Sequence, residues 1–121
     1  MKLNLILTIN HYLNQINLKE TNKLTSYWVS RNVRILKPTI ESFEQFRKAA
    51  IEDDWFKNYQ SKANENELDA REEYKIELDL LDGEFKTKLE SEIDVEFYKI
   101  SINDLEINPE YIEFLYDLIE G

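Results

Sequence analysis

Two acidic clusters carry the oxygen ligands that a divalent cation prefers in proteins. The first is the run Glu52, Asp53 and Asp54, and the second is the segment DLLDGE at residues 79–84. Because consecutive helical residues point about 100° apart, the first three side chains cannot chelate one ion from a regular helix. In the second cluster, Leu81 stands where the pattern of a calcium-binding loop needs a polar ligand. The sequence therefore predicts no metal site and no cofactor.

Side chains for nucleophilic or general-base catalysis are scarce. His11 is the only histidine of the chain, which has no cysteine. A catalytic triad or dyad needs a base that a third group orients and a nucleophile within its reach, and no sequence signature indicates either. Gly83 and Gly121 are the only glycines, so there is no glycine-rich phosphate loop. We expect His11 to be a partly exposed helix residue and the protein not to be an enzyme.

The formal net charge of −10 is spread unevenly along the chain. Residues 1–60 hold nine basic and six acidic side chains, whereas residues 61–121 hold six basic and nineteen acidic ones. An acidic surface attracts basic partners and speeds their encounter. We therefore predict that a protein partner with a basic surface binds to eight acids: Glu72, Glu73, Asp79, Glu106, Glu110, Glu113, Asp117 and Glu120. For Glu113, Asp117 and Glu120 the alternative interpretation is a solvated helix face that binds no partner.

A basic stripe at helical spacing lies in the first half of the chain, with Trp28 close to it. Its members are Lys23, Tyr27, Arg31 and Arg34. Basic residues interleaved with aromatic ones can contact nucleic acid. The simpler interpretation is pairing within the chain, for which the second half supplies Glu77, Glu84 and Glu90. Contact with a protein partner is a third interpretation, and we do not predict direct binding of nucleic acid.

The N-terminal residues fit two kinds of element. Apolar residues recur at spacings of three and four, which predicts an amphipathic helix over residues 4–16. Apolar residues also alternate with others over residues 2–9, so a strand is the competing interpretation. We favour the helix. No apolar stretch approaches the length of a membrane span, and we expect the protein in the cytoplasm.

A long helix is predicted next, over residues 23–58. Its apolar residues have the heptad-like spacing of one amphipathic face, and Thr21 or Asn22 could cap its start. Pro38 lies inside this stripe and removes one backbone donor. Either one kinked helix or two helices would satisfy this pattern, and we prefer the kink.

A second long helix is predicted over residues 66–91, after a polar segment at 58–67 that has the composition of a turn. Gly83 lies within this helix and costs about 1 kcal/mol relative to alanine. Two long helices joined by a short turn form an antiparallel hairpin. We expect one stripe, Val33, Leu36, Ile40 and Phe43, to pack against the other, Tyr74, Leu78, Leu81 and Phe85.

Residues 93–102 change the period of the pattern to two, because apolar and polar side chains alternate from Ile93 onward. This alternation predicts a strand, whose backbone groups need a partner. Residues 2–9 or a strand from another molecule could supply it. Further along, Asn108 and Pro109 are typical of a helix start and predict a short terminal helix.

Together these elements predict an α-rich α+β fold in a single domain, residues 1–121. It contains a long kinked antiparallel helical hairpin, one C-terminal strand and a short terminal helix. The chain has two glycines and two prolines, too few for the many tight turns of an all-β fold. The oligomeric state stays open.

Two segments carry a family resemblance: YKISINDLEINPEYIEFLYDLIE at residues 98–120 and, more loosely, LTSYWVSRNVRILKPTIESFEQFRK at residues 24–48. Together with the order of the elements, they resemble a group of small, mostly uncharacterised proteins of tailed bacteriophages. The resemblance implies a phage context and carries over no catalytic residue. Because nucleic-acid enzymes are basic where they hold phosphates, an acidic protein can compete for that surface.

The sequence therefore predicts a small non-catalytic protein that inhibits a host nucleic-acid-handling or defence protein in the host cytoplasm. The alternative is a structural or assembly subunit of the virion. In that case the lone strand and the broad apolar helix faces would complete neighbouring molecules.

Overall fold

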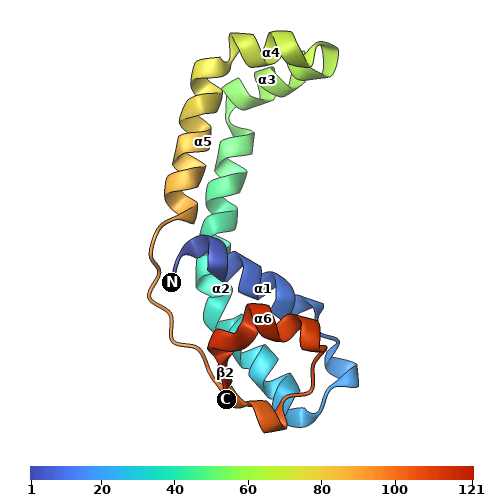
Figure 1. Cartoon of the computed structure of the whole chain (residues 1–121). Coiled ribbons are helices and arrows are strands. Elements are labelled where there is room, and N and C mark those ends of the chain that lie inside the picture. Colours follow the sequence, from blue (N-terminus) through green and yellow to red (C-terminus); the bar gives the residue numbers. More distant parts are fainter. The chain divides into compact units, whose positions relative to one another are not determined.

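The computed structural model describes residues 1–121 and is rich in helices, as the sequence predicts (Figure 1). The chain divides into two compact units: unit 1 is Met1–Ile40 with Glu92–Gly121, and unit 2 is Glu41–Ser91. In chain order the elements are α1 (Leu3–Gln15), α2 (Lys23–Glu52), α3 (Asp54–Glu65), α4 (Glu67–Glu73), α5 (Lys75–Leu89), β1 (Ile100–Ser101), α6 (Ile112–Leu115) and β2 (Ile119–Glu120). Short 3₁₀ turns lie at Leu18–Glu20, Ile102–Asp104, Pro109–Tyr111 and Tyr116–Leu118.

Helix α1 confirms the helical interpretation of the N-terminal residues. Its apolar residues at spacings of three and four form one buried face, which comprises Leu3, Ile6, Ile9 and Leu13. A strand over residues 2–9 would have turned half of these side chains away from the core. The competing interpretation, a strand, is wrong for these residues, and the only strand-like pairing near them is a single antiparallel bridge between Lys2 and Glu92.

Asn22 caps the start of helix α2, since its side-chain oxygen accepts a hydrogen bond of 2.7 Å from the backbone N–H of Thr25. The helix continues through Pro38 and ends at Glu52, because Asp53 adopts an extended backbone conformation. The predicted helix over residues 23–58 is therefore interrupted, although not at the proline.

The predicted turn over residues 58–67 is wrong. Most of this segment belongs to α3, and the chain leaves the helix at Asn66, whose side chain accepts a hydrogen bond of 3.2 Å from the N–H of Asp69. Polar residues such as Gln60 and Lys62 are good helix formers, so polarity alone did not distinguish an exposed helix from a turn. The predicted helix over residues 66–91 is divided at Tyr74 into α4 and α5.

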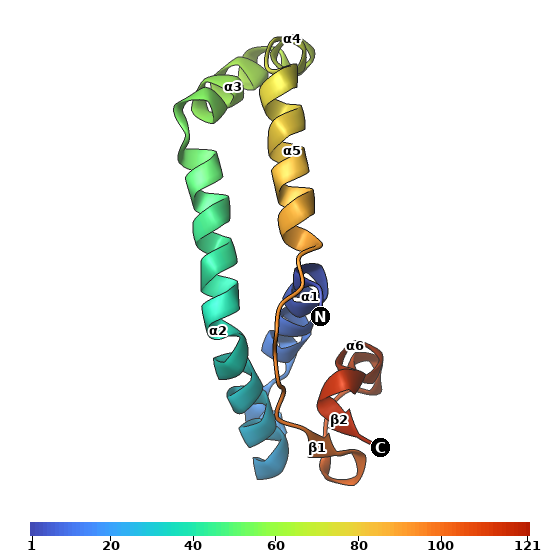
Figure 2. The ribbon, with the colours of Figure 1, turned by 90° about the vertical axis from the view of Figure 1, so that its left-hand side faces the viewer.

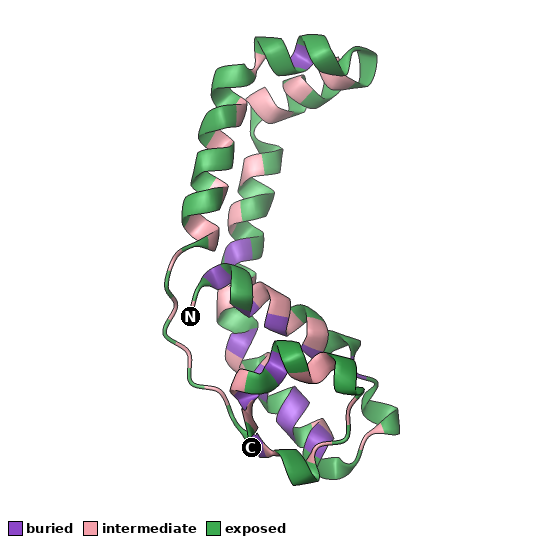
Figure 3. Ribbon diagram, in the orientation of Figure 1, coloured by how far each residue is buried: buried purple, intermediate pink, exposed green.

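The core of unit 1 joins α1, the first half of α2 and the C-terminal segment, as the buried positions in Figure 3 show. Trp28 and Leu36 of α2 are fully buried, as are Leu115 and Leu118 near the end of the chain. The indole N–H of Trp28 donates a hydrogen bond of 2.9 Å to the carbonyl oxygen of Leu118. Segments far apart in the sequence thus complete one core.

Only a small part of the strand predicted over residues 93–102 forms. Strand β1 pairs in parallel with β2 over two residues each. The preceding residues keep the predicted alternation, because Ile93, Val95 and Phe97 are half-buried against the core. Figure 2 shows this extended segment alongside the first half of α2. There the backbone of Tyr98 bonds to the side chain of Asn32 instead of to a second strand.

The predicted terminal helix is shorter than expected. Asn108 caps its start, since the side-chain oxygen accepts a hydrogen bond of 3.1 Å from the N–H of Glu110. Pro109 occupies the first position of the turn. However, the chain forms only a 3₁₀ turn, the four-residue α6 and a second 3₁₀ turn before β2. Because β2 pairs with β1, the last residues are extended rather than helical.

Unit 2 is held together mainly by aromatic side chains. The Phe46 ring lies 4.9 Å from that of Phe85, which joins α2 to α5. Tyr74 packs near Trp55 and Tyr59 of α3, with ring centroids 6.4 and 6.0 Å apart. Between α3 and α4, Lys62 forms an ion pair with Glu73, and this carboxylate raises the pKa of Lys62 above its ordinary value.

The predicted packing of the two apolar stripes is correct at one position. Phe43 meets Phe85 with ring centroids 6.2 Å apart. The other members of the first stripe, Val33, Leu36 and Ile40, pack in the core of unit 1 instead. A single helical stripe therefore contributes to both units.

Candidate protein-binding surfaces

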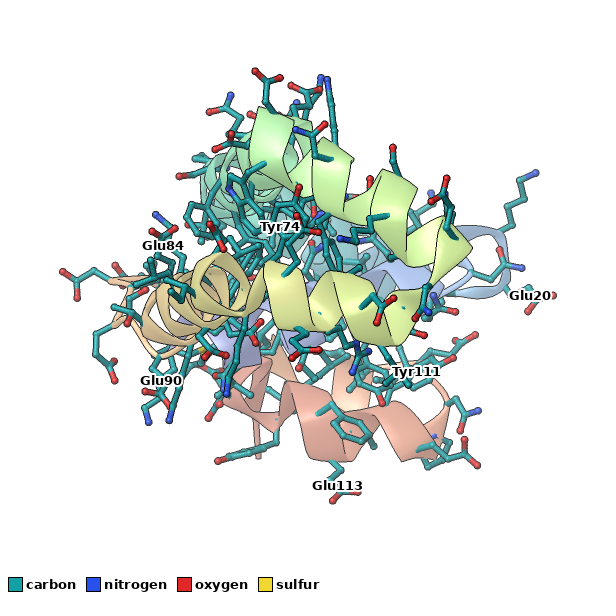
Figure 4. The ribbon with its side chains drawn as sticks, turned by 90° about the horizontal axis from the view of Figure 1, so that it is seen from above. Glu20, Tyr74, Glu84, Glu90, Tyr111 and Glu113 are labelled. Carbon is teal, nitrogen blue, oxygen red and sulfur yellow. The ribbon has the colours of Figure 1, made fainter.

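Five of the eight predicted binding acids lie in the C-terminal segment of unit 1, which holds Glu106, Glu110, Glu113, Asp117 and Glu120. Asp117 is half-buried and the other four are exposed. Figure 4 shows the side chain of Glu113 projecting away from α6. None of the five carboxylates has an ion-pair partner within the chain. We refer to them below as the C-terminal acids.

Aromatic rings accompany the C-terminal acids, a feature that the sequence analysis missed. Phe114 is 37% exposed and Tyr116 is 65% exposed, each directly beside an acid in the sequence. Tyr12 of α1 stacks on Phe114 with centroids 4.1 Å apart and nearly parallel planes, which holds that ring in place. Aromatic faces attract lysine and arginine side chains. The acids and the rings therefore favour the same class of partner.

The other three predicted binding acids lie in unit 2. Glu72 and Asp79 are exposed, whereas Glu73 is exposed but already paired with Lys62. The charge of Glu73 is therefore partly compensated within the chain. Glu72 and Asp79 together border a hollow of about 620 Å³ next to Arg71 and Lys75. The mixed charges around this hollow give it no clear preference for a basic or an acidic partner.

Arg31 of the predicted basic stripe has partners other than the expected glutamates. The guanidinium of Arg31 lies over the ring of Tyr98, 5.0 Å from its centroid, and donates a hydrogen bond of 2.9 Å to the hydroxyl of Tyr27. Pairing of Arg31 with Glu77, Glu84 or Glu90 was therefore the wrong interpretation. The contact of Arg31 with Tyr98 could not be predicted from the sequence, because it depends on the extended segment lying beside α2.

Groups suited to metal binding do not converge. No three Asp, Glu or His side chains come together in a way that could hold a metal ion. His11 is exposed on α1, as predicted, and its ring touches the edge of Tyr12. Asp53 separates α2 from α3, so Glu52 and Asp54 of the acidic run lie in different helices. Neither the long α2 nor any other helix combines the length and the apolar composition that a membrane span requires.

Unit 2 contains hollows that the sequence analysis did not predict. One, of about 350 Å³, is lined by Phe46, Ala49, Ala50, Asp53, Trp55, Glu77, Leu80, Leu81 and Glu84. A second, of about 650 Å³, is lined by Phe46, Asp79, Leu80, Gly83, Glu84, Thr87, Lys88 and Ser91. Because the two share Phe46, Leu80 and Glu84, we describe them together as the α5 groove. The signal in the sequence was a second apolar stripe on the same helix, which starts at Ile76.

The sequence matches no protein-family model, and no significantly similar protein was found among characterised proteins or solved structures.

Proposed function

We propose that this protein is a non-catalytic binding protein whose partner presents a basic surface. The observation that carries the proposal is the group of C-terminal acids, which have no ion-pair partner within the chain. Two of them, Glu113 and Asp117, are sequence neighbours of the exposed rings of Phe114 and Tyr116. Carboxylates steer a basic partner during approach, and the rings give its lysine or arginine side chains a surface to pack on.

The biological setting belongs to the same proposal. The resemblance to small phage proteins suggests that the protein acts in the cytoplasm of an infected bacterium. A host enzyme that handles nucleic acid is basic where it holds phosphates, so an acidic protein that covers this surface would inhibit it. The proposal keeps the long kinked antiparallel helical hairpin that the sequence predicts as the architecture of this protein.

A virion or assembly subunit is the second candidate function. It is favoured by the pairing of β1 with β2 over only two residues each, which leaves most of the extended segment without a strand partner.

Affinity capture tests the proposal with two matched baits. Wild-type protein and the variant E113Q/D117N/E120Q are immobilised and exposed to lysates of infected and uninfected bacteria. The variant keeps side-chain size and removes three charges. We expect wild-type protein to retain a basic nucleic-acid-binding protein, and the variant to retain much less of it. A third bait, E20Q/E65Q/D82N, removes three exposed charges elsewhere and should behave like wild type.

The recovered partner is then used in a kinetic measurement. Loss of the three C-terminal charges should slow association and flatten its dependence on salt, because exposed charges act mainly on encounter. Equal association rates and equal salt slopes for wild type and E113Q/D117N/E120Q would contradict the proposal. Recovery of capsid, portal or tail proteins in place of a host enzyme would favour the virion alternative.

A further inference from the structure

Opposite its half-buried apolar face, helix α5 exposes two large apolar side chains, Ile76 and Leu80. The half-buried face comprises Tyr74 at its start and Leu78, Leu81, Phe85 and Leu89 within it. Residues two positions away point about 200° around the helix. There a second stripe follows at intervals of four, three and four: Ile76, Leu80, Gly83 and Thr87. Ile76 is 74% exposed and Leu80 is 65% exposed. A helix packed on one side only would present polar residues on the other.

The exposed face is hollowed around Leu80. On one side Ala49 and Ala50 of α2 are small, which leaves the first hollow of the α5 groove between them and Leu80. Along the helix, a Cβ atom added at Gly83 would meet no atom within 4 Å. The second hollow of the groove passes over this glycine. Side chains of a docked helix could therefore enter on both sides of Leu80.

Acids surround the groove. Asp53, Glu77 and Glu84 line the first hollow, and Asp79 and Glu84 line the second. All four of these side chains are exposed. None of these four carboxylates has an ion-pair partner within the chain. The only basic side chain of the lining is Lys88, which lies over the ring of Phe46.

We propose that the α5 groove binds an amphipathic helix of another protein, with an apolar stripe that meets Leu80 and with lysine or arginine on both flanks. A helix in a groove anchors through apolar residues at spacings of three and four, which matches the exposed stripe of α5. The flanking charges pair across the interface as they do beside the seam of a coiled coil. A second copy of α5 is a poorer occupant, because Glu77 and Glu84 would meet acids of the same kind.

This inference rests on the proposed function in one respect, that the partner is a basic protein. It uses other residues, all of them in unit 2. The C-terminal acids and the α5 groove can therefore be tested separately.

The probe is a synthetic helical peptide of about four turns, with leucine at spacings of three and four and lysine on both flanks. Two control peptides have the same length. One carries glutamate in place of lysine, and the other has the same composition in an order that scatters the leucines. None of the three peptides contains tryptophan, so all of the tryptophan fluorescence comes from the protein. Trp55 lines the groove and reports docking, whereas Trp28 is fully buried in unit 1.

We expect the peptide to shift the tryptophan emission of the wild-type protein to the blue and to bind at least tenfold more tightly than either control peptide. Leu80→Ser should weaken this binding at least tenfold. Leu68→Ser is the matched control, because Leu68 is 81% exposed on α4 and lies outside the groove. E113Q/D117N/E120Q should bind the peptide as wild type does.

Gly83→Gln separates docking from folding. A glutamine at this position meets no atom of the chain at its Cβ and favours the helix more than glycine does, so the melting temperature should rise. The same side chain fills the groove, so peptide binding should fall at least tenfold. Unchanged binding to Gly83→Gln or to Leu80→Ser would overturn the proposal, as would equal binding of the scattered-leucine peptide. A concentration-dependent dimer that Leu80→Ser abolishes would also overturn it, because the occupant would then be a second copy.

Discussion

Asn32 shows how one side chain can replace a strand. It is fully buried on α2, and its amide nitrogen donates hydrogen bonds to the carbonyl oxygens of Trp28 and Tyr98, at 2.9 and 2.8 Å. Its side-chain oxygen accepts a hydrogen bond of 2.9 Å from the N–H of Tyr98. The amide thus satisfies both backbone groups of one residue in the extended segment, as a neighbouring strand would.

We predict that Asn32→Leu lowers the free energy of unfolding by about 1–3 kcal/mol. Leucine has a similar size, but it leaves the N–H and the carbonyl of Tyr98 without their partners in a partly buried place. Urea unfolding followed by circular dichroism measures the change. Asn103→Ala is the control, because the Asn103 side chain is exposed and should contribute little. An equal midpoint for Asn32→Leu and wild type would show that water satisfies Tyr98 equally well.

Some residue roles could be predicted from the sequence and others could not. Asn108 caps the turn that follows it, as expected, and Asn22, one of the two candidates with Thr21, caps α2. Both could be predicted because a cap depends only on the next three residues. The role of Asn32 was not predicted, because its partner lies 66 positions away. Likewise, the exposure of Phe114 and Tyr116 depends on which side of the C-terminal segment faces α1.

At the scale of elements, helix α1 and the start of α2 could be predicted because their apolar faces have a clear helical period. The strand over residues 93–102 could not be predicted correctly, since alternation reports which side chains turn inward and not what the backbone pairs with. The predicted packing of α2 was largely wrong for a related reason. Its stripe continues without a break past Ile40, and no local signal marks that Leu36 and Phe43 belong to different units.

The difference between the two units leads to a prediction for Leu36 and Leu78. Both belong to the apolar stripes of the predicted long helices, but they lie in different units. Leu36 is fully buried, whereas Leu78 remains partly exposed on α5. We predict that Leu36→Ala lowers the free energy of unfolding by about 2–5 kcal/mol. Leu78→Ala should cost less than about half as much, because it removes less buried surface. Parallel denaturant titrations of the two variants decide the order, and a larger loss for Leu78→Ala would contradict the burial described above.

Pro38 gives a second prediction for α2. It lies in the interior of a helix, at an exposed position, and lacks the N–H that would bond to the carbonyl four residues earlier. Alanine restores this donor, so Pro38→Ala should stabilise the helix by up to about 3 kcal/mol and raise the melting temperature. Differential scanning calorimetry measures it. A lower melting temperature would mean that the proline ring itself contributes to packing.

At the scale of the whole molecule, the two units differ in how much they bury. The core cluster of unit 1 contains ten buried apolar residues. In unit 2 only Phe43 and Ala70 are buried, and half-buried aromatic rings supply the rest of the packing. Local stability follows the number of buried apolar contacts, so the units should open independently and with different free energies.

Amide hydrogen exchange should resolve this difference. We predict that the amides of Ile9 and Leu13 in α1 exchange at least tenfold more slowly than those of Leu81 and Phe85 in α5. Opening of unit 1 exposes a buried core, whereas opening of unit 2 exposes side chains that are already partly accessible to solvent. Exchange followed by mass spectrometry of peptides from each helix provides the measurement. Equal protection of α1 and α5 would indicate that the chain opens as one cooperative body.

The composition of unit 1 from two separated segments sets an order of events on the ribosome. Residues 41–91 are consecutive and can pack as soon as they emerge, whereas Trp28 and Leu36 must wait for Leu115 and Leu118. At typical elongation rates of about 5–20 residues per second, the wait from Leu36 to Leu115 lasts on the order of 4–16 s. During that interval the nascent chain displays the apolar faces of α1 and α2 to the solvent, where a chaperone or a neighbouring chain can reach them.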